Sequence, residues 1–482
     1  MLFNSFQFLI FLPVVFLLYW FVFRERRWQN LLVVMASYVF YGWWDWRFLT
    51  LIAITSVCSY ASGLLIERFE GNRGRQRLVS AANIVLNLLI LGYFKYFNFF
   101  VENLDLLVQS VTGYHLDWVT MDIILPVGIS FYTFQALSYT IDVYRRQIPA
   151  THDAIEFFAY ISFFPQLVAG PIERATNLLP QFQRSRNFDY AQAVDGLRQM
   201  LWGFLKKLVV ADNCAMVVND LWNKYDTLPG LGLFMLGVMF TLQIYCDFSG
   251  YSDIAIGCAR LFGFNLMRNF NYPYFSRNIP EFWRRWHISL TSWFRDYIYI
   301  PLGGNRCSRG RMIGNVLIVW AISGLWHGAN WTFICWGLYH AVLLVIYNLL
   351  GINTKRKPIV AKGRLLPTIG ETAQMALTFV LAVIGWIIFR CEDMTQAVHF
   401  ISRMFTALPD GMPVIYGKKG LLMGIVVLLV EWLQRDKQHA LQLDPARGVL
   451  KYSAVRYVLY AAIVLAMFVM AGQVQTFIYF QF

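Results

Sequence analysis

The chain has 482 residues, of which 58% are hydrophobic and only 14% are charged, and its net charge is +13. A soluble domain carries about 25% charged residues, so this composition excludes an ordinary water-soluble fold and indicates a protein that uses the bilayer as its solvent. The positive charge alone would suggest a nucleic-acid partner. The cytoplasmic loops of membrane proteins also collect Lys and Arg, and that explanation fits this composition better.

The first apolar run covers residues 6–23 and ends at a basic cluster at 24–27. No basic residue precedes it and no small-residue cleavage site follows it, so we expect a retained first membrane span. Pro126 and Pro165 lie near the ends of later apolar segments and predict re-entrant pieces, because irregular backbone at membrane depth occurs where it lines a cavity or is buried in protein. Further spans of roughly 20 residues are expected near 30–46, 48–66, 78–101, 126–144, 154–170, 230–247, 311–326, 330–350, 372–390, 419–433 and 453–474.

The loop charges predict an orientation. Basic groups lie at 24–27, 68–77 and 145–146, on one side of the predicted spans, whereas the 102–122 loop on the other side holds acidic residues and no Lys or Arg. The positive-inside rule places the basic loops in the cytoplasm. The N-terminus is then extracytoplasmic, and the later basic stretches at 306–311 and 355–364 are cytoplasmic.

Residues 191–214 are not predicted as a plain span. Apolar side chains recur there at helical spacing, and Lys206, Lys207 and Asp212 share the same helix. This pattern is typical of an amphipathic helix at a membrane interface, which we expect to be the cytoplasmic one.

Residues 279–303 are rich in Trp and Arg. Trp283, His287 and Thr291 follow i, i+4 spacing, so we expect one helix that carries them on one face. Tryptophan prefers the membrane interface and arginine can extend to the headgroups, so this helix is expected to lie partly in the cytoplasmic leaflet.

His327 lies between two apolar stretches and beside Gly324 and Gly328. An ionisable residue at membrane depth is costly and is a functional hypothesis by default. The alternative is a buried histidine that is hydrogen-bonded to a carbonyl. For His287, a functional role and simple solvation at the interface are equally open.

The acidic residues Asp247 and Asp253 are six positions apart, so on one helix they point to different faces and do not form a carboxylate pair. Asp247 is expected to cap a helix that follows Ser249. The sequence contains no G-x-S-x-G elbow, Walker loop, H-E-x-x-H or C-x-x-C motif, so a serine hydrolase, an NTPase, a zinc protease and a metal site are not expected.

Four stretches in order resemble the membrane-bound O-acyltransferase (MBOAT) family. The similarity extends over nearly the whole chain and is strongest to the bacterial branch of the family, which acts in alginate O-acetylation and teichoic-acid D-alanylation. The four stretches are 164–174 (FPQLVAGPIER), 245–253 (YCDFSGYSD), 279–304 and 325–328 (LWHG).

The resemblance implies an all-α polytopic membrane protein with a single domain over residues 1–482. In such a domain a ring of about eleven tilted transmembrane helices, with re-entrant and interfacial helices, surrounds a thinned centre. His327 matches the catalytic histidine of the family and His287 matches the upstream histidine of the branch. The resemblance further implies acetyl transfer from cytoplasmic acetyl-CoA to an extracytoplasmic acceptor, with His327 as general base and with no bound cofactor.

The basic residues Arg284, Arg285, Lys206 and Lys207 would attract the phosphates of that donor, although membrane topology alone explains their charge equally well. The expected partners are an extracytoplasmic serine-esterase-like acetyltransferase and a polysaccharide, and the expected location is the inner (cytoplasmic) membrane. D-alanyl transfer to teichoic acid stays open as an alternative. So does a transporter or scaffold role in a polysaccharide export complex.

Overall fold

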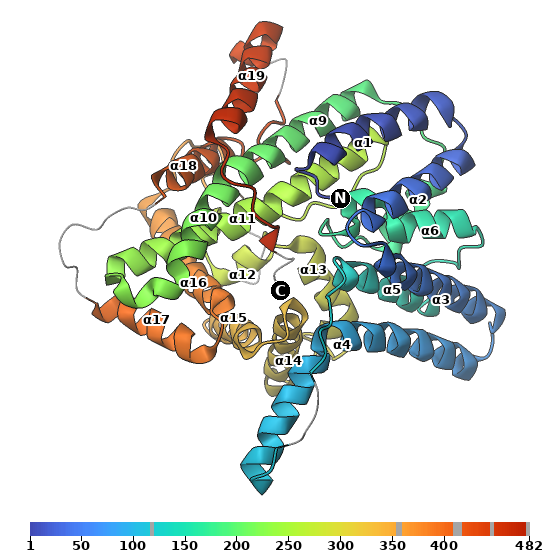
Figure 1. Cartoon of the computed structure of the whole chain (residues 1–482), viewed down its shortest axis with the longest axis horizontal. Helices are drawn as coiled ribbons and strands as arrows, with labels where there is room; N and C mark the ends of the chain where they lie inside the picture. The colour runs from blue at the N-terminus through green and yellow to red at the C-terminus, as the bar shows by residue number, and fades with distance from the viewer. Residues whose placement is uncertain (116–119, 353–358, 408–416, 444–447, 479–482) are drawn as a thin grey trace. The chain divides into compact units, whose positions relative to one another are not determined.

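The computed structural model describes residues 1–115, 120–352, 359–407, 417–443 and 448–478 (Figure 1). Within these ranges the regular secondary structure is helical and includes no strand, which confirms the predicted all-α class. The chain divides into two compact units, Met1–Tyr190 with Ala259–Leu266, and Ala191–Cys258 with Met267–Phe482. The expectation of one functional domain over 1–482 stays a prediction.

Six helical segments among the described residues are long and apolar enough to cross a membrane, which confirms a multi-pass membrane protein. They coincide with predicted spans, whereas the total of about eleven transmembrane helices stays a prediction. The segments are Trp46–Arg68, Arg73–Thr112, Gly230–Leu261, Trp331–Leu349, Ile369–Arg390 and Ser453–Met470.

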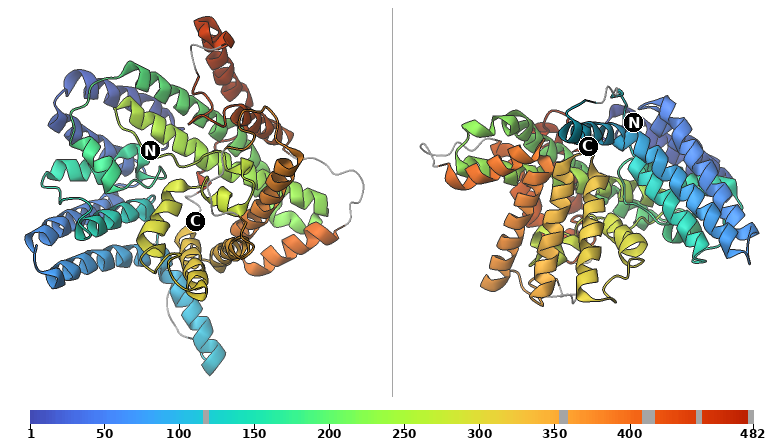
Figure 2. Two further views of the ribbon diagram at one scale, coloured as in Figure 1. Left: turned by 180° about the vertical axis from the view of Figure 1, so that it is seen from behind. Right: turned by 90° about the horizontal axis from the view of Figure 1, so that it is seen from below.

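In the first unit, helices α3, α4 and α5 lie side by side (Figures 1 and 2). Buried polar side chains join them: Thr140 accepts from Asn83 at 2.7 Å and lies 3.2 Å from the hydroxyl of Ser62. Such contacts between helices substitute for the hydrophobic effect that lipid cannot supply. The helices of this unit are α1 (Phe6–Leu17), η1 (Leu18–Val22), α2 (Arg26–Gly42), η2 (Trp46–Phe48), α3 (Leu49–Arg68), α4 (Arg73–Thr112), α5 (Ile129–Tyr144), α6 (Ala154–Ser162), α7 (Phe164–Leu167) and α8 (Ala175–Phe182).

The predicted span at 154–170 is interrupted. Two short helices, α6 and α7, occupy this stretch and the chain breaks at Phe163 before Pro165. Proline has no N–H and clashes with the carbonyl four residues before it, so it is tolerated in the first turn of a helix but not in the interior. Pro165 lies in the first turn of α7, so the break has a local cause. The outcome agrees with the expected interruption of helices near this proline.

In the second unit, α14, α15 and α16 run side by side (Figure 2, right). The helices of this unit are α9 (Tyr190–Leu205), η3 (Lys206–Ala211), α10 (Asp212–Leu221), η4 (Trp222–Thr227), α11 (Gly230–Leu261), η5 (Pro273–Phe275), α12 (Ile279–Trp283), α13 (Ile288–Phe294), η6 (Arg295–Tyr299), α14 (Arg309–His327), α15 (Trp331–Leu349), α16 (Ile369–Arg390), α17 (Met394–Thr406), α18 (Lys418–Leu433), η7 (Gly448–Lys451) and α19 (Ser453–Met470).

The close approach of α14 and α15 depends on glycine. A Cβ at Gly324 would collide with the backbone of Phe333, and a Cβ at Gly337 would collide with the backbone carbonyl of Trp320. Small residues allow helix backbones to approach closely in membranes. These two glycines thus determine where the end of α14 lies against α15, and His327 is the last residue of α14.

The charged side chains at the end of the predicted interfacial stretch 191–214 are buried in the protein. Lys207 is 7% exposed, and its ammonium group lies 2.8 Å from Asp212 and 2.9 Å from Asp247. The prediction that these side chains face water or headgroups was therefore wrong, whereas the place of the helix at the cytoplasmic interface stays a prediction. The expected capping role of Asp247 was also wrong, because Asp247 lies in the interior of α11 and pairs with a lysine that is distant in sequence.

The residues that follow α19, 471–478, form a tail that docks on the same ion group. Gln475 accepts from the Lys207 ammonium at 3.1 Å through its backbone carbonyl. The backbone N–H of Ile478 donates to Asp247 at 2.8 Å. Phe477 is 3% exposed and lies against the ring of Tyr251, with ring centroids 4.8 Å apart. The tail is thus an integral part of the second unit.

Candidate active site

A cavity of about 850 Å³ lies in the second unit. Its walls include both candidate histidines, His287 and His327, and the two candidate arginines, Arg284 and Arg285. Small-molecule sites typically have volumes of about 300–1,000 Å³. Four of the six predicted site residues therefore line one cavity of suitable size.

The cavity follows one face of α14. Met312, Val316, Trp320, Ser323 and His327 line it, at the spacing of successive helical turns. Since each residue rises about 1.5 Å along a helix, the cavity wall from Met312 to His327 is roughly 22 Å long. This length is about three quarters of the hydrocarbon thickness of a bilayer, which is about 30 Å.

His327 lies in an aromatic setting at the end of α14. Its side chain is buried, and its ring lies 5.0 Å from that of Trp336 and 5.3 Å from that of Phe389, both edge-on. The two glycines beside it leave no room for a side chain: a Cβ at Gly328 would collide with the ring of Phe333. The packing after α14 thus accommodates only glycine at position 328.

His287 is oriented by an asparagine that the sequence analysis did not single out. Asn269 donates through Nδ2 to Ser252 at 3.1 Å, so its Oδ1 faces His287 Nδ1 at 3.1 Å. In that arrangement Nδ1 carries the ring proton, and the lone pair of the neutral ring is on Nε2. His287 lies between the candidate spans, and burial lowers its pKa to about 3, so the ring is neutral at physiological pH.

The continuous helix predicted for 279–303 is wrong. The stretch contains α12 and α13, which His287 separates with a left-handed φ of 43°. Trp283, His287 and Thr291 therefore do not lie on one helical face. The break has a tertiary cause, because the backbone N–H of Ile288 donates to the Asn269 carbonyl at 2.9 Å. A non-glycine residue with positive φ is strained and is often found at functional sites.

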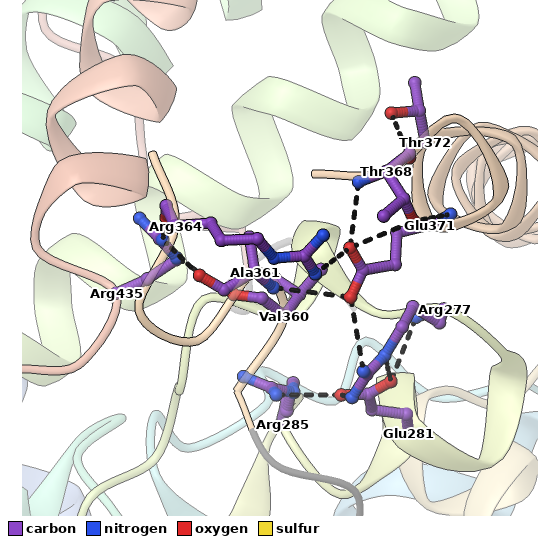
Figure 3. A network of polar contacts seen from close by, with 10 residues as sticks. All are labelled: Arg277, Glu281, Arg285, Val360, Ala361, Arg364, Thr368, Glu371, Thr372 and Arg435. Atoms are coloured by element: carbon purple, nitrogen blue, oxygen red, sulfur yellow. Dashed lines mark hydrogen bonds and ion pairs between the residues drawn. The ribbon is translucent and has the colours of Figure 1, made fainter. Parts of the chain in front are cut away.

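Arg285 reaches the cavity from a buried ion network (Figure 3). Its guanidinium donates to Glu281 at 2.8 Å and to the Asn271 carbonyl at 3.2 Å. Glu281 also accepts two hydrogen bonds from the side chain of Arg277, both at 3.0 Å. Burial raises the pKa of Glu281, but the bonds from Arg277 and the charge of Arg285 outweigh it and lower that pKa overall, so Glu281 stays ionised.

Lys206 and Lys207 are not among the residues that line the cavity. The Lys206 ammonium lies 2.7 Å from Asp253 and 2.8 Å from the hydroxyl of Ser249. Lys207 pairs with Asp212 and Asp247, as described above. This geometry favours a role in buried ion pairs, and phosphate binding by the two lysines stays a prediction.

Two other histidines have structural settings. His340 is buried and accepts from the indole N–H of Trp283 at 3.3 Å. His439 is 2% exposed and lies 3.1 Å from a carboxylate oxygen of Asp195. Neither lines the cavity.

Glu281 and Asn269 are the residues that sequence reasoning missed. Glu281 could have been found, since it lies four positions after Arg277 and four before Arg285, which is the spacing for ion pairs on a helix. Asn269 had no such signal, because its contact with His287 crosses a turn between separate elements.

The comparisons with known proteins agree with this arrangement. The family model of MBOAT, the membrane-bound O-acyltransferase family, matches residues 38–380. The chain belongs to this family and is an O-acyltransferase of the membrane.

Named relatives have related activities. The chain is 42% identical to the probable alginate O-acetylase AlgI of Pseudomonas aeruginosa, over 84% of this chain and 75% of that protein. It is 34% identical to the peptidoglycan O-acetyltransferase of Helicobacter pylori, over 84% of this chain and 80% of that protein. It is 31% identical to the teichoic acid D-alanyltransferase of Bacillus subtilis, over 55% of this chain and 68% of that protein.

Proposed function

We propose that this enzyme transfers an acetyl group from cytoplasmic acetyl-CoA to an extracytoplasmic acceptor during O-acetylation of an exopolysaccharide, with His327 as general base. The observation that supports this most is the single cavity lined by His287, His327, Arg284 and Arg285. It combines two imidazoles suited to proton transfer with two cations suited to an anionic donor.

The donor enters from the cytoplasmic side in this proposal. The loop charges at 306–311 assign the start of α14 to the cytoplasm. The cavity follows α14 from Met312 to His327, over roughly 22 Å. A thioester arm that enters the cavity at Met312 can therefore reach His327 while the phosphates of the donor stay near Arg284 and Arg285. Acetyl-CoA is a substrate here, and no resident cofactor is proposed.

The reaction needs one proton to move. The imidazole of His327 takes the proton of the acceptor hydroxyl as that oxygen attacks the thioester carbonyl. The C–S bond of the tetrahedral intermediate then breaks, and the departing thiolate recovers the proton from His327. The products are an ester and a free thiol, so atoms and charges balance. His287 guides the acceptor in this proposal: its Nδ1–H is directed at Asn269, so the Nε2 lone pair can accept a hydrogen bond from the acceptor hydroxyl but cannot donate to the developing oxyanion.

The acceptor is inferred from relatives. The names of the Pseudomonas and Helicobacter proteins give alginate and peptidoglycan as targets of O-acetylation. We propose a polysaccharide acceptor, an inner-membrane location with an extracytoplasmic N-terminus, and an extracytoplasmic serine-esterase-like partner that passes the acetyl group on.

D-alanyl transfer is the second candidate, because the chain also matches a teichoic acid D-alanyltransferase. That match covers 55% of this chain at 31% identity, whereas the alginate O-acetylase match covers 84% at 42%. The comparison favours acetyl transfer.

Replacement of His327 by glutamine tests the proposal. Glutamine keeps a polar side chain but cannot accept a proton at neutral pH. Loss of a general base costs on the order of 10²–10⁴ in rate, so polymer acetylation should almost cease while the protein level in the membrane stays normal. A stable His327→Gln protein with near-normal acetylation would overturn the general-base role of His327.

A further inference from the structure

The part of the cavity wall that contains Arg285 is held by a relay of charged side chains that starts outside the cavity. Figure 3 shows Glu281 between Arg277 and Arg285, and Glu371 between Arg277 and Arg364. The distances along the relay are 2.8 Å for Arg285–Glu281, 3.0 Å for Glu281–Arg277, 3.9 Å for Arg277–Glu371 and 2.9 Å for Glu371–Arg364. Three guanidinium groups and two carboxylates leave this relay with one net positive charge.

Glu281 has no capacity left for a ligand. Its carboxylate accepts from the backbone N–H of Arg277 at 3.1 Å, from two side-chain nitrogens of Arg277, and from Arg285. Four donors fill the roughly four lone-pair sites of a carboxylate. Asn278 caps the helix start by accepting from the N–H of Glu281 at 2.8 Å, so the position of Glu281 is fixed from both sides.

Arg285 does have capacity for a ligand. A guanidinium has five N–H donors, and its bonds to Glu281 and the Asn271 carbonyl use two of them. The side chain is 10% exposed and lines the cavity. Glu281 thus holds one edge of the guanidinium and leaves other N–H groups for an anion in the cavity.

The relay also holds a second part of the wall. Arg435 donates to the backbone carbonyls of Val360 and Ala361 at 3.0 and 2.9 Å. Ala361 has a strained left-handed φ of 50°, and its N–H points to Glu371 at 3.4 Å. The neighbouring residue Ile359 lines the cavity. A strained conformation persists only where its surroundings enforce it, and here Arg435 and Glu371 supply that enforcement.

We propose that Glu281 is a positioning residue for the acyl donor: it fixes the Arg285 guanidinium at the cavity wall so that Arg285 binds a phosphate of the donor. Arg277 and Glu371 keep Glu281 in place. This inference rests on the proposed function, because it takes a phosphorylated thioester as the ligand of the cavity.

Binding of coenzyme A to the purified full-length chain in lipid nanodiscs tests the inference. Glu281→Gln keeps the shape of the side chain but removes the charge that holds Arg285. Loss of this charge-assisted contact should raise the Kd for coenzyme A about tenfold. The matched control is Glu70→Gln, which makes the same change in an exposed ion pair with Arg146, and its Kd should equal that of the unaltered chain.

A double-mutant cycle separates positioning from general damage. Arg285→Met should itself weaken coenzyme A binding, and Glu281→Gln should add no further loss in that background. Equal losses in both backgrounds would show that Glu281 acts through the fold and would overturn the inference. An unchanged or lower Kd for Glu281→Gln would overturn it as well.

Glu281→Asp replaces Glu281→Gln if the amide variant does not accumulate in the membrane. The shorter carboxylate keeps the charge but cannot contact Arg277 and Arg285 together, so the Kd should again rise, and an unchanged Kd would refute the positioning role. If the unaltered chain did not bind coenzyme A, that result would refute the proposed donor rather than the role of Glu281 alone.

Discussion

The backbone after α14 offers the sharpest test of how the fold positions His327. A Gly328→Ala substitution adds one methyl group at a residue whose φ of −169° alanine adopts without strain. The methyl group would collide with the ring of Phe333. That ring lies 4.8 Å from the ring of Phe389, which lies 5.3 Å from His327. Overpacking of this kind typically costs about 1–3 kcal/mol.

The displaced rings should move His327 from its position. A misplacement of about 1 Å in a catalytic group can cost on the order of 10² in rate. We therefore expect a large loss of polymer acetylation per unit of membrane-inserted protein. A smaller side chain at position 333 should relieve the collision, so Gly328→Ala combined with Phe333→Leu should recover part of the lost activity.

A control on the same helix is available at Gly314, where an added Cβ meets no atom within 4 Å. Gly314→Ala should keep full activity and stabilise the helix by up to about 1 kcal/mol. The steric reasoning would be refuted if Gly328→Ala had normal acetylation at a normal protein level, or if Gly314→Ala were equally damaging.

Three further outcomes are expected. His287→Ala should lower acetylation without loss of protein from the membrane, and unchanged acetylation would assign His287 a structural role. Lys207→Met leaves two buried carboxylates without their cation and should destabilise the fold by about 3–5 kcal/mol. The control Lys224→Met, in an exposed ion pair, should cost at most about 1 kcal/mol. Thermal unfolding in detergent measures both variants, and similar losses would contradict the burial argument. A cysteine label at position 72 should react from the cytoplasm and one at 105 from outside, and the reverse pattern would overturn the orientation.

The fold class was predictable because composition and apolar segment length are properties of the chain itself. The interruptions were harder to predict. Trp283, His287 and Thr291 have helical spacing, but the contact between Ile288 and Asn269 turns the backbone at His287 instead. Asp247 was misjudged for a related reason, since its partner Lys207 is forty residues away in sequence.

The candidate site was predictable where a motif carried it. His327 and His287 were predicted from their sequence surroundings and both line the cavity, whereas their catalytic roles stay a prediction. Lys206 and Lys207 were chosen by charge alone, and charge does not distinguish a cavity wall from a buried ion pair. Glu281 was missed although its spacing of four residues from both Arg277 and Arg285 is a signal in the sequence, because the prediction of site residues followed histidines and cations rather than their carboxylate partners.

The docked tail has a consequence for the biogenesis of the protein. Ribosomes add about 5–20 residues per second, so Lys207 and Asp247 enter the nascent chain within several seconds of each other, whereas Gln475 follows Lys207 by 268 residues and thus by roughly 13–54 seconds. During that interval the lysine and its carboxylates can neutralise one another, but Tyr251 cannot yet pack against Phe477. Docking of residues 471–478 is therefore a late step, completed after α9 to α18 have been synthesised.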